Sequence, residues 1–286
     1  MGVKFGPGGN PLDFSQKGYK SSVDMPLYLK DIGLNAYEYQ CNKGVKISEK
    51  TAGILAENAK KNDIFLSVHS QYYISLSGIE EEKRLKSIDY IMDCVRISKI
   101  LGAKRIVVHS GSASKITREE ALFLAKDTLK KTYEAIKSEG GYDDIHICPE
   151  TMGKINQLGN IDEVIELCTV SENFIPAIDF GHLNARTFGG IKTIKDYEEI
   201  LNKVENKLGF DRMKNFHSHF SKIEYSKSGG EVKHLTFEDN TFGPEFEPLA
   251  EIIYKRGLTP VIICESAGTQ GFDALYMKNV YESIKG

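Results

Sequence analysis

The stretch Ile106-Val107-Val108-His109 decides the fold, because it is a short β-branched run that ends on a residue type able to bind a metal ion. Five further apolar runs end in the same way, on His, Asp or Glu: Phe65-Leu66-Ser67-Val68-His69, Ile145-His146-Ile147-Cys148-Pro149-Glu150, Ile175-Pro176-Ala177-Ile178-Asp179, Phe216-His217-Ser218-His219 and Val261-Ile262-Ile263-Cys264-Glu265. One buried strand with such an end is ordinary. Six of them indicate side chains that converge at one end of a parallel barrel, where such barrels do their chemistry.

Short apolar runs alternate with helical patterns along the whole chain. The runs predict eight strands, near residues 4–5, 35–39, 66–69, 105–109, 146–150, 177–179, 214–220 and 261–265. Apolar residues three and four apart predict helices most strongly at 80–101, 117–138, 161–168, 193–208, 246–256 and 270–284. No linker rich in Pro, Ser or Gly divides the chain. We therefore predict one α/β domain over residues 1–286, a single (β/α)8 TIM barrel with its metal site at the C-terminal ends of the strands.

The segment between His219 and Phe246 departs from this alternation. It is polar and contains Gly229-Gly230 and Gly243-Pro244, so we predict a long loop there. Long loops in compact domains are usually functional. This one follows a strand that carries two histidines.

Composition sets broad limits on function. There is no uninterrupted run of about 18 apolar residues, and Met1-Gly2-Val3-Lys4-Phe5 lacks the plan of a signal peptide, so we expect a cytoplasmic monomer without membrane contact. The five cysteines form no C-x-x-C pair, and we expect them to be reduced. The net charge of -3 gives no global reason to expect nucleic-acid binding.

The residue types at the strand ends favour metal-dependent hydrolysis. Hydrolytic zinc sites combine imidazole with carboxylate and leave a position open for water, whereas structural sites favour Cys. No helical H-E-x-x-H is present, so a metal must be held by residues far apart in the chain. One local pair exists in Asp179-Phe180-Gly181-His182. Two or three metal ions would add about four to six positive charges at the mouth and make it attractive to phosphate.

With these motifs in place, the chain resembles the endonuclease IV family of apurinic/apyrimidinic DNA-repair nucleases over nearly its whole length. The motifs that carry the resemblance are Val68-His69-Ser70-Gln71-Tyr72, Val107-Val108-His109-Ser110-Gly111, Pro149-Glu150-Thr151, Ile178-Asp179-Phe180-Gly181-His182, His219-Phe220-Ser221, Lys233-His234-Leu235 and Cys264-Glu265-Ser266. The resemblance implies three zinc ions. The first is held by His69, His109 and Glu150, the second by Glu150, Asp179, His219 and Glu265, and the third by His182 and His234.

The resemblance also implies a reaction and a partner. The reaction is hydrolysis of the phosphodiester 5′ to an abasic site in double-stranded DNA, with Glu150 and Glu265 as catalytic residues. Tyr72, with Tyr73 beside it, matches the aromatic residue that fills the space left in the duplex. Basic side chains in loops after the strands are candidates for phosphate contacts: Lys154, Arg186, Lys222 and Lys227.

The chain departs from the family at the third metal. The family has an Asp two residues before the last His, and this chain has Val232 there. Glu231 could replace it from one residue away, or a third ion could be weakly bound or absent. Two DNA-contacting segments also differ, at Ser221-Lys222 and at Tyr37-Glu38-Tyr39-Gln40.

Two other functions remain open. A sugar isomerase or epimerase of the xylose isomerase-like barrel class would need only one metal and the subset Glu150, Asp179, His219 and Glu265. That alternative leaves His69, His109 and His182 less explained. The barrel could also bind damaged nucleic acid or a phosphorylated small molecule without efficient turnover. His217, which shares a strand face with His219, is either a further ligand or a polar core residue.

Overall fold

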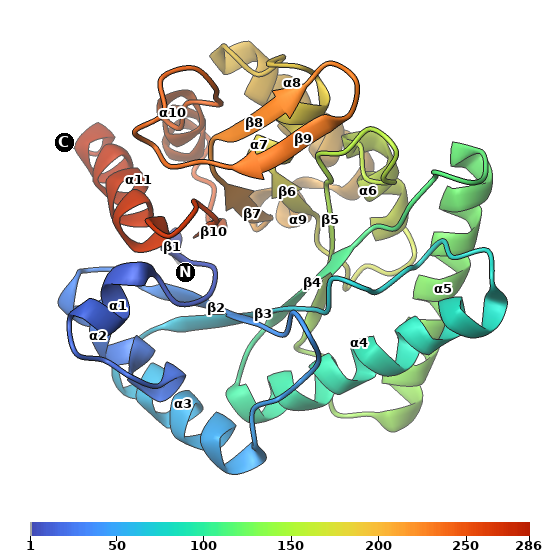
Figure 1. The fold of residues 1–286 in the computed structure, drawn as a ribbon, viewed down its shortest axis with the longest axis horizontal. Helices are drawn as coiled ribbons and strands as arrows, with labels where there is room; N and C mark the ends of the chain where they lie inside the picture. The colour runs from blue at the N-terminus through green and yellow to red at the C-terminus, as the bar shows by residue number, and fades with distance from the viewer. Residues whose placement is uncertain (1) are drawn as a thin grey trace.

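The computed structural model describes residues 2–286 and contains the predicted barrel. Eight parallel strands form one sheet in the order β1-β10-β7-β6-β5-β4-β3-β2, and the helices surround it (Figure 1). The strands are β1 (Lys4–Pro7), β2 (Ala36–Gln40), β3 (Phe65–His69), β4 (Arg105–His109), β5 (His146–Glu150), β6 (Ala177–Asp179), β7 (His217–Phe220) and β10 (Val261–Cys264).

The six helices predicted most strongly are all present, with ends within one residue of the prediction: α4 (Glu81–Leu101), α5 (Arg118–Glu139), α6 (Ile161–Cys168), α8 (Ile194–Leu208), α10 (Glu247–Lys255) and α11 (Gln270–Ile284). Capping boxes led by Thr117, Asn160 and Thr193 fix three of these starts. The remaining helices are α1 (Leu12–Gln16), the 3-10 turn η1 (Ser22–Asp24), α2 (Met25–Asp31), α3 (Glu49–Lys61), α7 (Phe180–Arg186) and α9 (Phe210–Lys214). Between residues 2 and 286, no helix combines the length and apolar character needed to cross a bilayer.

Two predicted boundaries were wrong. The seventh strand does not begin at Lys214, because residues up to Lys214 form α9 and β7 begins at His217. The polar segment after His219 is not a simple loop, because it contains the antiparallel hairpin of β8 (Ile223–Ser226) and β9 (Gly230–His234). Both strands are too short and too polar to show a period of two in the sequence. Figure 1 shows this hairpin in orange beside α7, over the β6 and β7 side of the barrel.

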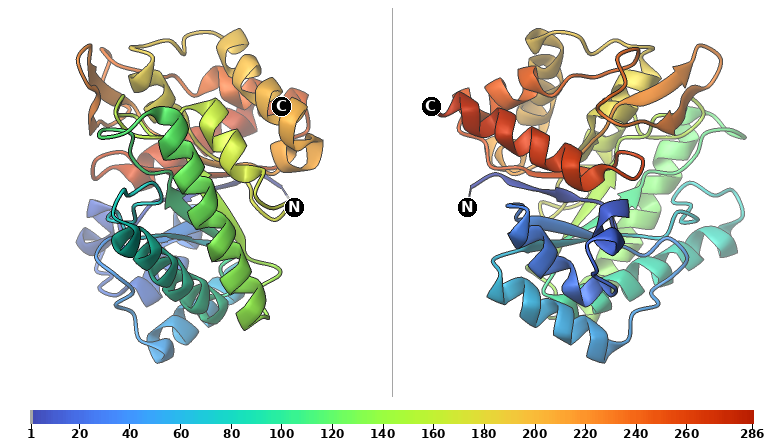
Figure 2. Two further views of the ribbon diagram at one scale, coloured as in Figure 1. Left: turned by 90° about the vertical axis from the view of Figure 1, so that its right-hand side faces the viewer. Right: turned by 60° about the vertical axis from the view of Figure 1, so that its left-hand side comes forward.

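The barrel closes between β1 and β2 through a few contacts and not through a continuous ladder. The amide of Asn35 donates to the Phe5 carbonyl (3.0 Å), and the amide of Gly9 donates to the Glu38 carbonyl (3.0 Å). Gly6 makes this approach possible, because a Cβ there would lie 1.7 Å from the Ala36 carbonyl oxygen. In the right-hand view of Figure 2, the red helix α11 lies along the blue strand β1, against which it packs.

Alternate residues of each strand face the barrel interior and form layers. Near the N-terminal ends of the strands, Arg105 is buried and its guanidinium donates to the Phe216 carbonyl (3.0 Å). Above it lie two apolar clusters, formed by Val107, Cys148, Ile175 and Ala177, and by Ala36, Val261 and Ile263. On β4 and β5 the next inward residue is the last of the strand, so His109 and Glu150 lie at the C-terminal mouth.

Replacing Gly6 with Ala should destabilise the fold by about 2 kcal/mol or more, because the new methyl group collides with the Ala36 backbone and forces β1 away from β2. The matched control is Gly53→Ala in α3, where a Cβ meets no atom within 4 Å. That change should be neutral or stabilise the protein by up to about 1 kcal/mol. Urea unfolding followed by circular dichroism measures both, and equal stabilities for the two variants would contradict a role of Gly6 in closing the barrel.

Candidate metal centre

Strand register brings the predicted residues to one level at the mouth. His109 of β4 pairs with Glu150 of β5, and Asp179 of β6 pairs with His219 of β7. Each of these residues lies two positions after an inward-facing one, so its side chain also points into the barrel. The alternation of neighbouring strands thus gathers at one point residues that lie far apart in the chain.

Three of the groups whose possible ligand atoms lie within 4.8 Å of one another include all the predicted ligands. The first contains His69, His109 and Glu150, the second contains Glu150, Asp179, His219 and Glu265, and the third contains His182, Glu231 and His234. All nine residues predicted as metal ligands are therefore brought together.

Glu150 belongs to both of the first two groups and offers a different oxygen to each. Its Oε2 lies 3.5 Å from His69 Nε2 and 3.4 Å from His109 Nε2. Its Oε1 lies 2.8 Å from His219 Nδ1. A carboxylate placed in this way is suited to bridge two cations.

The third group depends on an irregularity in the hairpin. Tyr225 pairs with Glu231, but Glu224 pairs with Lys233, so Val232 is an extra residue on β9. Such a bulge re-aims the side chains beside it. Glu231 Oε2 consequently lies 3.5 Å from His182 Nε2, while Val232 is half exposed. Glu231, and not Val232, is thus the hairpin residue whose side chain faces His182.

The hairpin is also anchored to the loop that follows β5. The amide of Ile155 donates to the Gly229 carbonyl (3.2 Å), and the amide of Glu231 donates to the Gly153 carbonyl (3.2 Å). At Gly230, where φ is +76°, a Cβ would lie 2.3 Å from the Gly153 oxygen. Only glycine fits there, so Gly230 allows the approach that brings Glu231 to His182.

The charges of this cluster balance through its histidines. Burial opposes ionisation of Glu150, but His219, His69 and His109 hold the pKa of its carboxyl well below the usual range. Burial also disfavours a charged His69, yet contact with Glu150 and the charges of Glu38 and Glu265 raise its pKa to about 9. For His109 burial dominates and lowers the pKa to about 4. In the absence of cations, protons on some of the rings supply the positive charge that the buried carboxylates need.

The residues fit divalent cations by a separate criterion. Within residues 2–286, two buried carboxylate oxygens, Glu150 Oε2 and Asp179 Oδ2, have no hydrogen-bond partner. A buried charged oxygen left in this way is costly unless it coordinates a cation. The donor set of imidazole nitrogens and carboxylate oxygens, with no thiolate, is that of a catalytic site and not of a structural zinc site.

The predicted DNA-contacting residues fall into two classes. Tyr72 and Tyr73 are exposed beside the mouth, with their rings edge-on at 5.5 Å, and Lys154 and Lys227 are also exposed. These four remain predictions.

Two other predicted contacts already have partners inside the protein. The guanidinium of Arg186 donates to four carbonyl groups of the loop after β5, those of Met152, Lys154, Ile155 and Gln157. Lys222 is buried, donates to the Asp239 carbonyl (2.7 Å) and pairs with Glu245 (3.0 Å). Because both side chains are engaged inside the protein, we do not propose Arg186 and Lys222 as phosphate contacts.

The sequence did not point to a role for Glu38, which the structure adds to the site. It is fully buried on β2, and its Oε1 lies 2.8 Å from His219 Nε2. The available signal was a lone carboxylate in a strand that otherwise reads Ala36-Tyr37 and Tyr39-Gln40. His217, for which the sequence allowed either a ligand or a core role, lies with its Nε2 3.0 Å from the other Glu38 oxygen.

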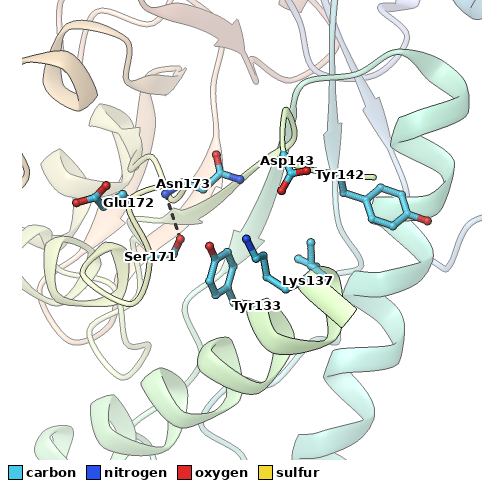
Figure 3. A pocket seen from close by; sticks show the side chains of 8 residues that line it. Tyr133, Lys137, Tyr142, Asp143, Ser171, Glu172 and Asn173 are labelled. Carbon is cyan, nitrogen blue, oxygen red and sulfur yellow. Dashed lines mark hydrogen bonds between the residues drawn. The ribbon is translucent and has the colours of Figure 1, made fainter. Parts of the chain in front are cut away.

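The pocket of Figure 3 lies away from this centre. Its lining residues include Tyr133 and Lys137 of α5, and Asn173 before β6, whose amide donates to Ser171 Oγ (3.1 Å). These segments precede β5 and β6, so they lie at the end of the barrel opposite the mouth. No predicted site residue lines the pocket.

Comparison with known proteins identifies a family and two kinds of relative. Residues 27–280 match the family described as xylose isomerase-like TIM barrel. An uncharacterized protein of Methanocaldococcus jannaschii is 33% identical over 280 residues, 98% of this chain and 97% of its own length. A probable endonuclease 4 of Mycoplasma pneumoniae is 30% identical over 160 residues, 54% of this chain and 52% of its own length.

Solved structures share the fold. A D-tagatose 3-epimerase-like protein superposes with a TM-score of 0.70 at 21% identity, over 98% of this chain and 96% of its own. Endonuclease IV of Thermus thermophilus superposes with a TM-score of 0.63 at 15% identity, over 98% of both chains. At such identities the likeness concerns the barrel and does not choose between the two activities.

Replacing Glu231 with Ala should lower the metal content of the fully loaded protein by one ion per chain, because it removes the only carboxylate of the third group. The matched control is Glu224→Ala on the same hairpin, where the carboxylate pairs with Lys233 outside the three groups. Elemental analysis after saturation and gel filtration measures the ratio. Equal metal content in both variants and the wild type would show that Glu231 holds no ion.

Proposed function

Since the chain belongs to the xylose isomerase-like TIM barrel family, we propose that it is a zinc-dependent endonuclease of the endonuclease IV type, which hydrolyses the phosphodiester 5′ to abasic sites in DNA. The family and the clustered ligands already indicate a metal-dependent enzyme on this barrel. The choice of reaction is our inference.

One observation carries the proposal: Glu150 lies between two groups of ligands, and a third group stands beside them. A single-metal isomerase uses one carboxylate-rich group and has no role for His69, His109, His182 or His234. Phosphoester hydrolysis has a role for all of them, because several cations can hold the attacking and departing oxygens of one phosphate.

Zinc ions held by these residues would supply Lewis-acid polarisation of the phosphate and a water molecule of lowered pKa. The remaining work belongs to the chain. Glu265 is the least buried carboxylate of the second group, and its Oε2 lies 3.4 Å from His219 Nδ1. Burial opposes its ionisation, but His219 and His234 lower its pKa, so it is ionised at neutral pH. We assign it the removal of a proton from the attacking water.

Recognition of an abasic site needs a group that fills the gap left in the duplex. Tyr72 is 59% exposed and follows the mouth residue His69 by three positions. Its exposed ring, which packs edge-on against Tyr73, can therefore reach a bound duplex. The overall charge of -3 does not oppose DNA binding, because the cations of the centre would make the mouth positive where the phosphate docks.

The second candidate is a sugar epimerase. The group of Glu150, Asp179, His219 and Glu265 favours it, because one metal with opposed carboxylates suffices to move a proton at a sugar carbon. The fold likeness to the D-tagatose 3-epimerase-like protein is compatible with either activity.

Wild-type protein should contain two or three zinc ions and cut a duplex with one abasic site, and Glu150→Gln should lose activity by at least about 100- to 1000-fold. The loss is expected because the neutral amide no longer neutralises two cations. Glu224→Gln, on the exposed hairpin, should cut like the wild type. Gel assays with a 5′-labelled duplex, beside circular dichroism of each variant, give the comparison.

Full incision by a folded Glu150→Gln variant would contradict the nuclease assignment. The epimerase would replace it if the wild type held one exchangeable manganese ion, left DNA intact and incorporated solvent deuterium into a ketohexose. These readouts separate the two candidates because each requires a different metal content and a different bond to break.

Tyr72→Ala should weaken binding of abasic duplex by about 5- to 150-fold, corresponding to about 1–3 kcal/mol for one aromatic stacking contact. Its metal content should not change, because Tyr72 belongs to none of the ligand groups. Phe123→Ala is the control, since that aromatic side chain is exposed on α5 outside the mouth. Fluorescence anisotropy measures affinity, and equal losses in both variants would argue against a specific wedge.

A further inference from the structure

A chain of buried polar groups runs beneath the metal centre, inside the barrel. It consists of Glu38 on β2, Ser67 on β3, and His217 and His219 on β7, all fully buried. The zinc-dependent reaction proposed above uses only His219 among them. Burying the charge of Glu38 costs free energy, so we expect a neighbouring group that interacts with this carboxylate.

His219 connects this chain to the metal centre through its two ring nitrogens. Nδ1 lies 2.8 Å from Glu150 Oε1 and 3.4 Å from Glu265 Oε2, so this edge of the ring faces the second ligand group. Nε2, on the other edge, lies 2.8 Å from Glu38 Oε1. A neutral imidazole that coordinates a cation through Nδ1 carries its proton on Nε2, and that proton then points at Glu38.

Glu38 also has neighbours on β3 and β7. Ser67, its partner in the ladder between β2 and β3, donates its hydroxyl to Glu38 Oε2 (2.9 Å). His217 Nε2 lies 3.0 Å from the same oxygen. Oε2 is therefore fixed by the Ser67 hydrogen bond and lies beside the His217 ring, whose nitrogens make no hydrogen bond among residues 2–286, while Oε1 is left for His219. Such support is what a residue needs if it is to set the orientation of another side chain.

We propose that Glu38 is a positioning residue, which accepts the Nε2 proton of His219 and so holds the ring with Nδ1 turned toward Glu150, Asp179 and Glu265. The carboxylate also raises the basicity of the imidazole and strengthens its bond to a cation. This inference rests on the metal-dependent function proposed above, but it does not depend on whether the substrate is DNA or a sugar.

A competing possibility is a separate cation among Glu38, His217 and His219, whose ligand atoms also lie within 4.8 Å of one another. The hydrogen bonds oppose it. Ser67 donates to one Glu38 oxygen, and the other faces a nitrogen of a ring that is already turned to the second group. Within this group of described residues, Glu38 is the one carboxylate available to such an ion.

The test is Glu38→Gln, which keeps the size of the side chain and removes its charge. Binding of Co²⁺ is measured by competition with a chromophoric chelator, stoichiometry by elemental analysis, and coordination by the visible spectrum of the bound Co²⁺. We expect affinity at one site to fall by about 10- to 100-fold, with an altered spectrum and an unchanged number of ions at saturation. Glu38→Asp, which keeps the charge, should restore part of the affinity.

The matched control is Asp13→Asn, because Asp13 is another buried carboxylate, which accepts a hydrogen bond from Tyr28 (2.9 Å) and lies outside every ligand group. This control can lower the melting temperature but should leave Co²⁺ affinity and spectrum unchanged. If Glu38→Gln does not fold, Ser67→Ala provides the second variant, since it removes one support of Glu38 and should weaken the same site to a smaller extent.

Three results would overturn the proposal. The first is wild-type affinity and spectrum in a folded Glu38→Gln variant. The second is loss of one ion at saturation with the others bound as before, which would make Glu38 a ligand of its own ion. The third is a wild-type protein that binds no divalent cation. A wild-type protein that binds metal but leaves abasic DNA intact would end the nuclease proposal while this role of Glu38 stands.

Discussion

The structure depends on how the buried negative charge of Glu150 is balanced. This carboxylate lies at the mouth of the barrel, almost completely removed from water, with histidine rings within 3.5 Å on three sides. A carboxylate in such surroundings is strongly destabilising without positive charge nearby. The rings can supply that charge as protons, or cations can supply it in their place. Residues with separate roles, from Glu38 below to Glu231 above, are arranged around this requirement.

The barrel makes such a concentration of charge tolerable by keeping it at one end. Apolar layers around Val107 and Ile263 fill the interior beneath the mouth. A much larger apolar cluster forms between the strands and the helices outside them. Burial of this apolar surface is the main source of stability, so the polar mouth can be specialised for chemistry without carrying the fold. Polar residues also lie below the mouth, among them Glu38 and Ser67, which share a hydrogen bond.

Most of the fold could be predicted because the signals are local. Runs such as Ile106 to His109 end where the strands end, and capping residues such as Thr117 fix helix starts. The ligands at strand ends were predictable for the same reason. Glu38 was not, because its role depends on a contact with His219, which lies far away in sequence. The inward turn of Glu231 depends on a bulge at Val232, which no local pattern announces. Arg186 looked available for phosphate only because its carbonyl partners could not be foreseen.

The barrel and its additions contribute unequally to the choice between the two candidate activities. The second ligand group lies at the strand ends and could serve an epimerase or a nuclease equally well. His69 and His109 differ, because both face Glu150 Oε2, an oxygen that has no hydrogen-bond partner among residues 2–286. A cation held by His69, His109 and Glu150 would give that buried oxygen the partner that it lacks. The hairpin adds Glu231 and His234, and the contacts of Gly153 and Gly230 hold it in place. The barrel does not need His69, His109, Glu231 or His234 to form, and the proposal of phosphoester hydrolysis rests on these residues.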